Sequence, residues 1–318
     1  MKRWVASLGT IMVCILAWGG IAPADDAIAS PLYKQTENIV FHEVHGIGLL
    51  MDIFEPTTAK NNLAVVDVAS GSYFSDRGKI RQHQKFKVYD EFCEKGFTVF
   101  VIRPGSMTKW AIPEMADHVK VGIRWVRSHR DQYHLDTKKM GIVGASAGGH
   151  LASLVALTGD EGTSNAKDPL MRESCKVQAC AAFFPPADFL AWGGLNVDPN
   201  KTPGVPLMFK NIIFAGPAAP RSPERLRDQM MKISPAHQVK SDSPPFLLFH
   251  GDKDPIVPMQ QSQIFLSRLQ EKGIDSQLII KEGGEHPWPT LHEEVKVAVE
   301  WMDKKLRGMS DASSASAP

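Results

Sequence analysis

Short apolar runs alternate with amphipathic stretches along most of this chain. The apolar runs are nearly continuous and have the length of strands, which is typical of a sheet covered on both faces. They are Leu63–Val68, Phe97–Arg103, Met140–Val143, Val177–Phe184, Pro245–His250 and Ser276–Lys281. Apolar positions three or four residues apart predict helices between the runs. The helices are expected near Lys85–Lys95, Pro113–Tyr133 and Met259–Lys272, with a last one beginning after Thr290.

This alternation predicts an α/β fold, with a mostly parallel sheet and helices on both faces. Ile39–Val44 and Leu49–Phe54 are expected to form two further strands joined by a turn. From about 187 to 232 the regular alternation stops, and Pro, Gly and aromatic residues predict a small inserted cap of short helices and loops. A single α/β domain is therefore placed at residues 38–307.

The two ends of the chain have a different composition. Lys2 and Arg3 precede an apolar run that ends in small residues, which is the layout of a cleavable signal peptide over residues 1–24. An uncleaved membrane anchor is the alternative, but glycines interrupt the run, so no stable anchor is expected. Residues 25–37 are expected to form a flexible leader and residues 308–318 a disordered tail. A secreted or periplasmic protein is predicted.

Composition excludes several classes of function. The 318 residues carry a formal net charge of +1, and no basic cluster with interleaved aromatics occurs, so nucleic-acid binding is not expected. Cys93, Cys175 and Cys180 would remain after cleavage, and an odd number argues against a disulfide framework. On a strand, Cys175 and Cys180 would lie about 16 Å apart, beyond the reach of a disulfide. No metal-binding or nucleotide-binding motif is found, so neither a metal nor a cofactor is predicted.

The segment Gly141–Leu157 carries the strongest chemical signal. Its pentapeptide Gly144–Gly148 matches G-x-S-x-G, between a strand-like run and a helix-prone run. A serine in a tight strand-to-helix turn needs neighbours without side chains two residues before and after it. Such a turn exposes the hydroxyl of Ser146 and aims the free N–H groups of the following helix at the same place.

A serine hydroxyl needs a base within hydrogen-bond reach, and that base needs a carboxylate to fix its tautomer. His286 and Asp254 each lie in a loop that follows a predicted strand, and the order Ser, Asp, His is found in α/β-hydrolases. His292 is a rival base, but it lies inside a predicted helix. Asp252 is the rival acid, although it is suited to closing the turn through its own side chain.

Three segments together resemble the serine, aspartate and histidine loops of α/β-hydrolase-fold esterases. They are GASAGGHLASLVAL, HGDKDPIVPMQQSQ and GGEHPWP. The chain is similar to the bacterial feruloyl-esterase-like and acetyl-esterase group, which is related to the hormone-sensitive-lipase family. The resemblance runs from about residue 39 to 306. It implies that Ser146 is the nucleophile, Asp254 the acid and His286 the base.

The same resemblance implies an oxyanion hole after the first buried strand. The family has H-G-G-G and an aromatic residue there, where this chain has Ala69-Ser70-Gly71-Ser72-Tyr73. The N–H groups of Gly71, Ser72 and Ala147 are expected to form the hole, because backbone donors survive changes of side chain. Four aromatic residues are expected to line a substrate pocket: Tyr73, Phe74, Trp192 and Trp288.

Two further positions match the family. Arg103 and Asp117 are interpreted as a structural ion pair beneath the site, with substrate contact as the alternative, and His150 is expected to serve packing. A serine carboxylic-ester hydrolase is predicted, acting on a small or carbohydrate-linked ester such as an acetyl or feruloyl ester. A prolyl-oligopeptidase-type peptidase is one alternative, although the chain has no room for that family's propeller. A non-catalytic binding protein of the same fold is the other.

Overall fold

A computed structural model describes residues 30–197 and 223–308. An eight-stranded sheet runs through it in the order β1-β2-β4-β3-β5-β6-β9-β10. The strands are β1 (Tyr33–Val44), β2 (Ile47–Pro56), β3 (Ala64–Val68), β4 (Thr98–Arg103), β5 (Met140–Ala145), β6 (Ala179–Phe183), β9 (Phe246–Gly251) and β10 (Ser276–Lys281). β2 is antiparallel to β1 and β4, and all the other neighbours are parallel. The predicted α/β fold with a mostly parallel sheet is therefore confirmed.

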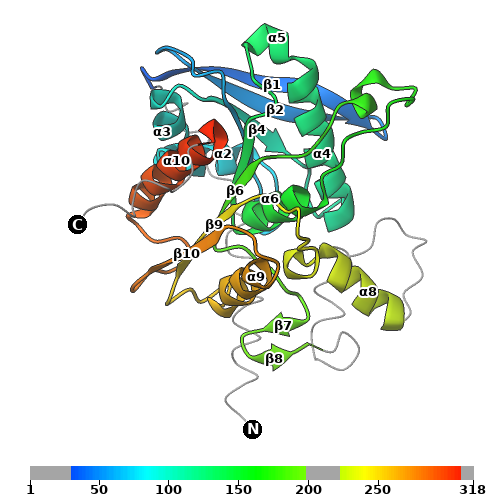
Figure 1. Cartoon of the computed structure of the whole chain (residues 1–318), viewed down its shortest axis with the longest axis vertical. Coiled ribbons are helices and arrows are strands. Elements are labelled where there is room, and N and C mark those ends of the chain that lie inside the picture. The colour runs from blue at the N-terminus through cyan, green and yellow to red at the C-terminus, as the bar shows by residue number, and fades with distance from the viewer. Residues whose placement is uncertain (1–29, 198–222, 309–318) are drawn as a thin grey trace.

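Helices cover both faces of this sheet (Figure 1). Side chains of α4, α6 and α9 join one apolar core, and those of α2, α3 and α10 join the other. Successive β3 residues alternate between the cores, with Val66 in the first and Val65 in the second, as the pleat of a strand requires. The helices are α2 (Arg77–Lys85), α3 (Val88–Glu94), α4 (Ile112–Ser128), α5 (Arg130–Tyr133), α6 (Ala147–Thr158), α8 (Pro223–Ile233), α9 (Gln260–Glu271) and α10 (Leu291–Arg307).

Short elements occupy the connections. They are the 3₁₀ turns η1 (Pro169–Arg172) and η2 (Pro235–His237), and a two-stranded ribbon of β7 (Ala191–Trp192) and β8 (Leu195–Asn196). β7, β8 and α8 fall within the predicted cap at 187–232, but residues 198–222 of that cap lie outside the described residues. The predicted signal peptide and residues 309–318 of the predicted tail lie outside them as well, whereas Gly308 is described and follows the end of α10.

Two predictions about the N-terminal half need correction. The expected leader extended to residue 37, but β1 begins at Tyr33, because this segment pairs with β2 as far as Pro56. A single helix was expected near residues 85–95, but two are present. Lys87, whose φ is +58°, separates α2 from α3, and α2 is too polar to show an apolar period.

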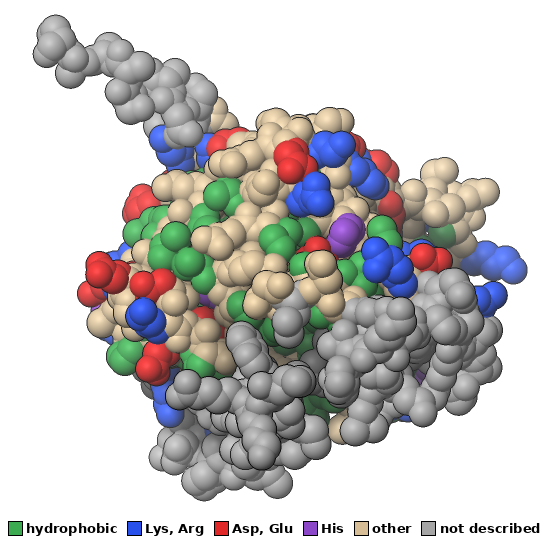
Figure 2. Space-filling view, turned by 90° about the horizontal axis from the view of Figure 1, so that it is seen from below, with side chains coloured by type: hydrophobic (Ala, Val, Ile, Leu, Met, Phe, Trp, Pro, Cys, Tyr) green, Lys and Arg blue, Asp and Glu red, His purple; other side chains and the backbone are tan. Residues whose placement is uncertain are grey.

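The three described cysteines are free thiols, as predicted, and all three are buried. No helix among the described residues is long and apolar enough to cross a membrane. Figure 2 shows a face on which Lys and Arg side chains are interspersed with Asp and Glu, with hydrophobic side chains between them. That mixture agrees with the small net charge of the sequence.

Candidate active site

Ser146 lies at the sharp turn between β5 and α6. Its backbone has φ 55° and ψ −122°, which is an unusual conformation for a residue with a side chain. A Cβ at Gly144 would lie 2.4 Å from the carbonyl oxygen of Gly148, and a Cβ at Gly148 would lie 2.2 Å from that of Val68. Only glycine fits at either position, which is the physical reason for the G-x-S-x-G spacing.

The turn brings Ser146 to the loops after β9 and β10. His286 Nε2 lies 2.8 Å from Ser146 Oγ, and His286 Nδ1 lies 2.6 Å from Asp254 Oδ2. A carboxylate can only accept, so the proton of a neutral His286 lies on Nδ1 and leaves Nε2 to accept the hydroxyl hydrogen of Ser146. The three side chains therefore form one hydrogen-bonded chain from the carboxylate of Asp254 to the hydroxyl of Ser146.

Asp254 is held by its own loop. Its Oδ1 accepts hydrogen bonds from the N–H groups of Ile256 and Val257, at 2.8 and 2.9 Å. Burial alone would raise the pKa of this carboxyl, but hydrogen bonds from His250 and His286 outweigh burial and hold the pKa well below its usual range. Asp254 is therefore ionised at neutral pH and keeps His286 in the required tautomer.

The rival residues lie elsewhere. Asp252 Oδ1 accepts from the N–H of Gly283 at 2.7 Å, so this side chain closes the turn between the two loops. His292 lies in α10, one residue after Leu291 begins that helix. The structure brings Ser146, Asp254 and His286 together. Neither Asp252 nor His292 joins them.

The loop after β3 forms a tight turn beside the serine. Gly71 and Phe74 exchange two backbone hydrogen bonds, and both central residues, Ser72 and Tyr73, have positive φ. This is a type I′ turn. The N–H of Gly148 donates to the carbonyl of Ser70 at 2.9 Å and so ties the turn to the start of α6.

One predicted oxyanion donor is wrong in this geometry. The N–H of Gly71 donates to the carbonyl of Phe74 at 2.9 Å and cannot also face a substrate. Within residues 30–197 and 223–308, no hydrogen bond engages the N–H of Ser72 or that of Ala147. These two donors remain for an oxyanion, and Ala147 adds the positive end of the α6 dipole.

A cleft of about 910 Å³, its open mouth included, adjoins Ser146 and His286. It extends toward α2, α3 and α10. Its apolar wall includes Phe86, Val88, Phe183, Phe184, Leu291 and Val295, and its polar wall includes Lys79, Gln82 and His83. Such a mixture of apolar surface and few polar groups is typical of a small-molecule site.

The predicted pocket residues do not line this cleft. Tyr73 and Trp288 are buried, and their polar atoms are engaged with His150 and Glu294 respectively. Phe74 closes the type I′ turn, and Trp192 stacks on Phe189. Besides the loops around Ser146 and His286, the lining includes residues of α2, α3 and α10, and no motif in the sequence marks these helical residues.

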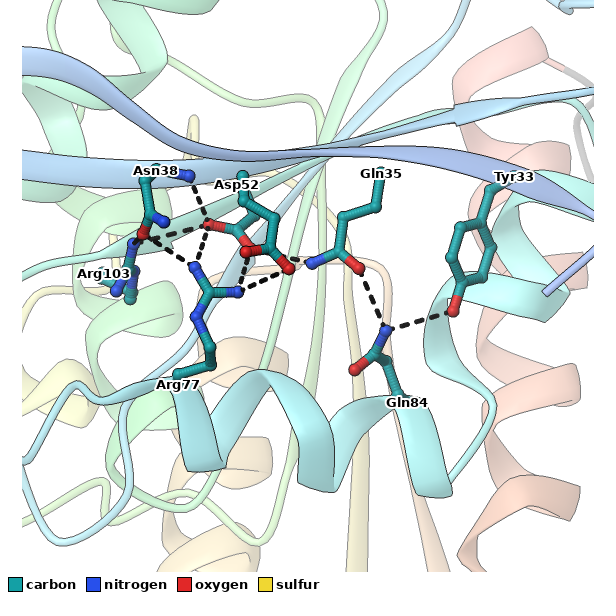
Figure 3. A network of polar contacts seen from close by, with 8 residues as sticks. Tyr33, Gln35, Asn38, Asp52, Arg77, Gln84 and Arg103 are labelled. Carbon is teal, nitrogen blue, oxygen red and sulfur yellow. Dashed lines mark hydrogen bonds and ion pairs between the residues drawn. The ribbon is translucent and has the colours of Figure 1, made fainter. Parts of the chain in front are cut away.

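The predicted Arg103–Asp117 ion pair is also wrong. Asp117 is exposed on α4 and pairs with Lys120, whereas Arg103 contacts Asp52 and Asn38 (Figure 3). Asp52 is fully buried and accepts a hydrogen bond from Arg77 at 2.9 Å. The network therefore fastens α2 to the β1–β2 hairpin.

His150 does pack in the core, as expected, but it also makes a directed contact. Its Nε2 lies 2.6 Å from the carbonyl oxygen of Ile233, so this nitrogen carries the proton, and its Nδ1 accepts from the hydroxyl of Tyr73 at 3.1 Å. Burial lowers the pKa of His150 to about 4, although the hydrogen bond to Ile233 opposes this shift. The histidine is thus neutral and links the type I′ turn to the end of α8.

The strand order, the turn at Ser146 and the three meeting side chains together define an α/β-hydrolase fold. Solved structures agree in fold. A truncated carbohydrate esterase from gut microbiota matches with a TM-score of 0.72 and 22% identity, over 88% of this chain and 99% of that one. An acetyl ester-xyloside bifunctional hydrolase from Caldicellulosiruptor lactoaceticus matches with a TM-score of 0.69 and 22% identity, over 86% and 98% of the two chains.

The chain belongs to the BD-FAE family, whose model matches residues 51–269. Among curated proteins it is similar to the probable carboxylic ester hydrolase LipM of Mycobacterium tuberculosis. The two are 27% identical over 60% of this chain and 42% of LipM. The chain spans about half the length of the curated relatives it matches.

Proposed function

We propose that this protein is a serine carboxylic-ester hydrolase that works through an acyl-enzyme. The observation that carries the proposal is the 2.8 Å contact between His286 Nε2 and Ser146 Oγ, at the apex of a turn that exposes the hydroxyl. Membership of the BD-FAE family and similarity to proteins named as esterases support the same reaction.

Each group has one task in the proposed reaction. Ser146 Oγ attacks the ester carbonyl carbon while His286 Nε2 takes the hydroxyl proton, and the carbonyl oxygen becomes an anion facing the N–H groups of Ser72 and Ala147. The C–O bond to the alcohol then breaks, and His286 returns the proton to the departing oxygen. A water molecule then attacks the acyl carbon while His286 takes one of its protons. The bond to Ser146 Oγ breaks, His286 returns the proton to Oγ, and the carboxylic acid is released.

For the substrate we propose acetyl or feruloyl esters of carbohydrates. Two structural neighbours are described as a carbohydrate esterase and as an acetyl ester-xyloside hydrolase, which supports this class.

We also propose that the protein is exported and loses residues 1–24. The charged start followed by an apolar run supports export. N-terminal sequencing of the protein recovered from the periplasm or medium tests it, and an intact Met1 in that fraction contradicts cleavage.

Hydrolysis of short p-nitrophenyl esters by a Ser146→Ala variant tests the reaction. We expect turnover to fall to the background rate, because the attacking oxygen is removed. Ser153→Ala is the matched control, since Ser153 lies on the same helix and points into the core. Unchanged turnover by Ser146→Ala refutes the proposal. Turnover of Xaa-Pro amides in place of acyl esters favours the peptidase alternative.

A further inference from the structure

A second pair of a carboxylate and an imidazole lies in the cleft, apart from Asp254 and His286. Asp67 Oδ2 lies 2.7 Å from His83 Nδ1, and both residues line the cleft beside Ser146. The contact between Asp254 Oδ2 and His286 Nδ1 is nearly the same, at 2.6 Å. His286 uses its other ring nitrogen to contact Ser146. Among the described residues, no hydrogen bond engages the corresponding nitrogen of His83, Nε2.

Asp67 is a charged residue inside the otherwise apolar strand β3, and it is 1% exposed. Its Oδ2 also accepts from the hydroxyl of Tyr89 at 3.0 Å, and burial raises the pKa of Tyr89, so that hydroxyl keeps its proton. Its Oδ1 is buried and has no hydrogen-bond partner in the part of the chain that the structure describes. A buried carboxylate with an unsatisfied oxygen costs stability, which favours a functional reason for its presence.

Asp67 also determines which nitrogen of His83 can bind a ligand. A carboxylate can only accept, so His83 donates through Nδ1, and Nε2 of the neutral ring is an acceptor. On another face of α2, Arg77 and Gln84 join the network around Asp52 (Figure 3), which fixes the rotation of the helix. The acceptor of His83 is therefore held in one place by contacts that do not involve a ligand.

The cleft around His83 is suited to an apolar group that ends in a hydrogen-bond donor. The hydroxyl of Ser70, which also lines the cleft, is buried without a partner among residues 30–197 and 223–308. The helices α3 and α10 and the end of α2 contribute apolar side chains to the same cleft, which are Phe86, Val88, Leu291 and Val295. Apolar surface with few fixed polar groups orients a ligand through those polar groups.

His83 is bound to a part of the sheet that lies away from Ser146. Asp67 pairs with Val143 across β3 and β5, and Ser146 follows Val143 by three residues. Three residues of a strand span about 10 Å. A substrate group bound at His83 is therefore remote from the ester carbonyl.

We propose that His83, oriented by Asp67, binds a hydroxyl group at the far end of an ester substrate. This inference rests on the proposed hydrolase function and deepens it by naming a residue that recognises the substrate and the group that it recognises. The hydroxyl donates to Nε2 while the ester carbonyl lies between Ser146 and the Ser72 N–H. A methyl group of the same size fills the same space and leaves Nε2 without a hydrogen bond.

Esters that differ only at the far end of an aryl group test the proposal. In the acyl series, p-nitrophenyl esters of 3-phenylpropanoic acid carry a hydroxyl, a methyl or a methoxy group at the para position. In the alcohol series, the acetates of 2-phenylethanol carry the same three groups. The readout, at pH 8, is the ratio of kcat/KM for the hydroxyl ester to that for the methyl ester.

The wild-type ratio should exceed one in at least one series. The methoxy ester accepts hydrogen bonds but cannot donate one, so it should be no better than the methyl ester. His83→Asn should lower the ratio about tenfold, because the shorter amide can still donate to Asp67 but places no acceptor where Nε2 lies. His83→Gln extends an amide to that place and should keep part of the preference.

Lys85→Asn is the matched control, since it makes the same replacement at an exposed position of α2 outside the cleft, and its ratio should equal that of wild type. An equal loss in Lys85→Asn overturns the proposal, and so does an unchanged ratio in His83→Asn.

The wild-type protein alone can also overturn the proposal, which keeps it testable if His83→Asn fails to fold. A ratio of one or less in both series has this meaning, as does a methoxy ester that is as good as the hydroxyl ester. Failure of the hydrolase function itself is a different result, in which the wild type turns over no ester of either series.

Discussion

Replacing Asp254 with Asn changes one atom at the end of the proposed triad. The N–H groups of Ile256 and Val257 both donate to Oδ1, so they hold the amide oxygen of the new side chain at that position. The amide NH₂ then occupies the place of Oδ2, where it faces His286 Nδ1 at about the present 2.6 Å. Two donors cannot share one hydrogen bond, so Nδ1 must become the acceptor and Nε2 must carry the proton.

His286 in that tautomer cannot accept the hydroxyl proton of Ser146. We expect kcat for a short neutral ester to fall about a thousand- to ten-thousand-fold, with little change in KM, because positioning of the substrate does not depend on the proton. Steady-state kinetics with p-nitrophenyl acetate at pH 7 measures both constants.

Asp252→Asn is the matched control for this experiment. Asp252 lies two residues away, and its contact is with the N–H of Gly283, so its loss should leave kcat within a few-fold. The reasoning is refuted if Asp254→Asn keeps more than about a tenth of the wild-type kcat, or if the two variants lose activity equally.

The same variant tests the electrostatics of the folded state. The pKa of Asp254 is depressed on folding, so the carboxylate stabilises the protein above its unfolded pKa of about 3.9, and this stabilisation is lost as the pH falls through the folded value. Asp254→Asn should therefore lower the free energy of unfolding by about 2 kcal/mol at pH 7. Urea titrations should show the two proteins converging below about pH 4. A constant difference at all pH values contradicts this account.

Three further outcomes follow from the contacts around the site. Tyr73→Phe removes the hydroxyl that donates a hydrogen bond to His150 Nδ1, so the type I′ turn loosens. We expect kcat to fall about tenfold at constant KM, and an unchanged kcat contradicts a role of Tyr73 in holding the turn. Gly148→Ala places a Cβ 2.2 Å from the carbonyl oxygen of Val68; the free energy of unfolding in urea should fall by about 2 kcal/mol or more, and a neutral effect is inconsistent with the tight packing. His150 has a folded pKa of about 4, below its unfolded value of about 6.5, so its contribution is complete above the unfolded value and declines as the pH falls. Protonation of His150 in the unfolded chain should therefore lower the free energy of unfolding by about 3 kcal/mol between pH 7 and pH 4. The His150→Gln variant should not show this loss.

Sequence reasoning could predict the features that depend on local geometry. Gly144 is required by a contact with Gly148 inside the turn, and Gly148 by a contact with Val68 of β3. The pentapeptide between a strand-like run and a helix-prone run therefore indicates the turn. The loops of Asp254 and His286 follow strands whose carboxyl ends meet at one edge of a parallel sheet. Their meeting at one edge therefore follows from the mostly parallel sheet, which the alternating apolar pattern predicts.

The features that it missed depend on which way a side chain points. Trp288 is aromatic and close to His286 in sequence, but its indole donates to Glu294 and faces the core. Gly71 matches an oxyanion position, but its N–H closes the turn with Phe74. Arg103 pairs with Asp52 of the β1–β2 hairpin, whereas Asp117 faces solvent and pairs with Lys120. Periodicity and motif spacing carry no information about these orientations.

The central claim is that the hydroxyl oxygen of Ser146 is the nucleophile and becomes acylated during the reaction. Mass spectrometry of the protein after treatment with a fluorophosphonate probe, followed by peptide mapping, tests it most directly. The account predicts one adduct per chain, on Ser146, which is absent from Ser146→Ala and much slower to form in Asp254→Asn. An unlabelled wild-type protein, or an adduct on a residue away from the turn between β5 and α6, would contradict it.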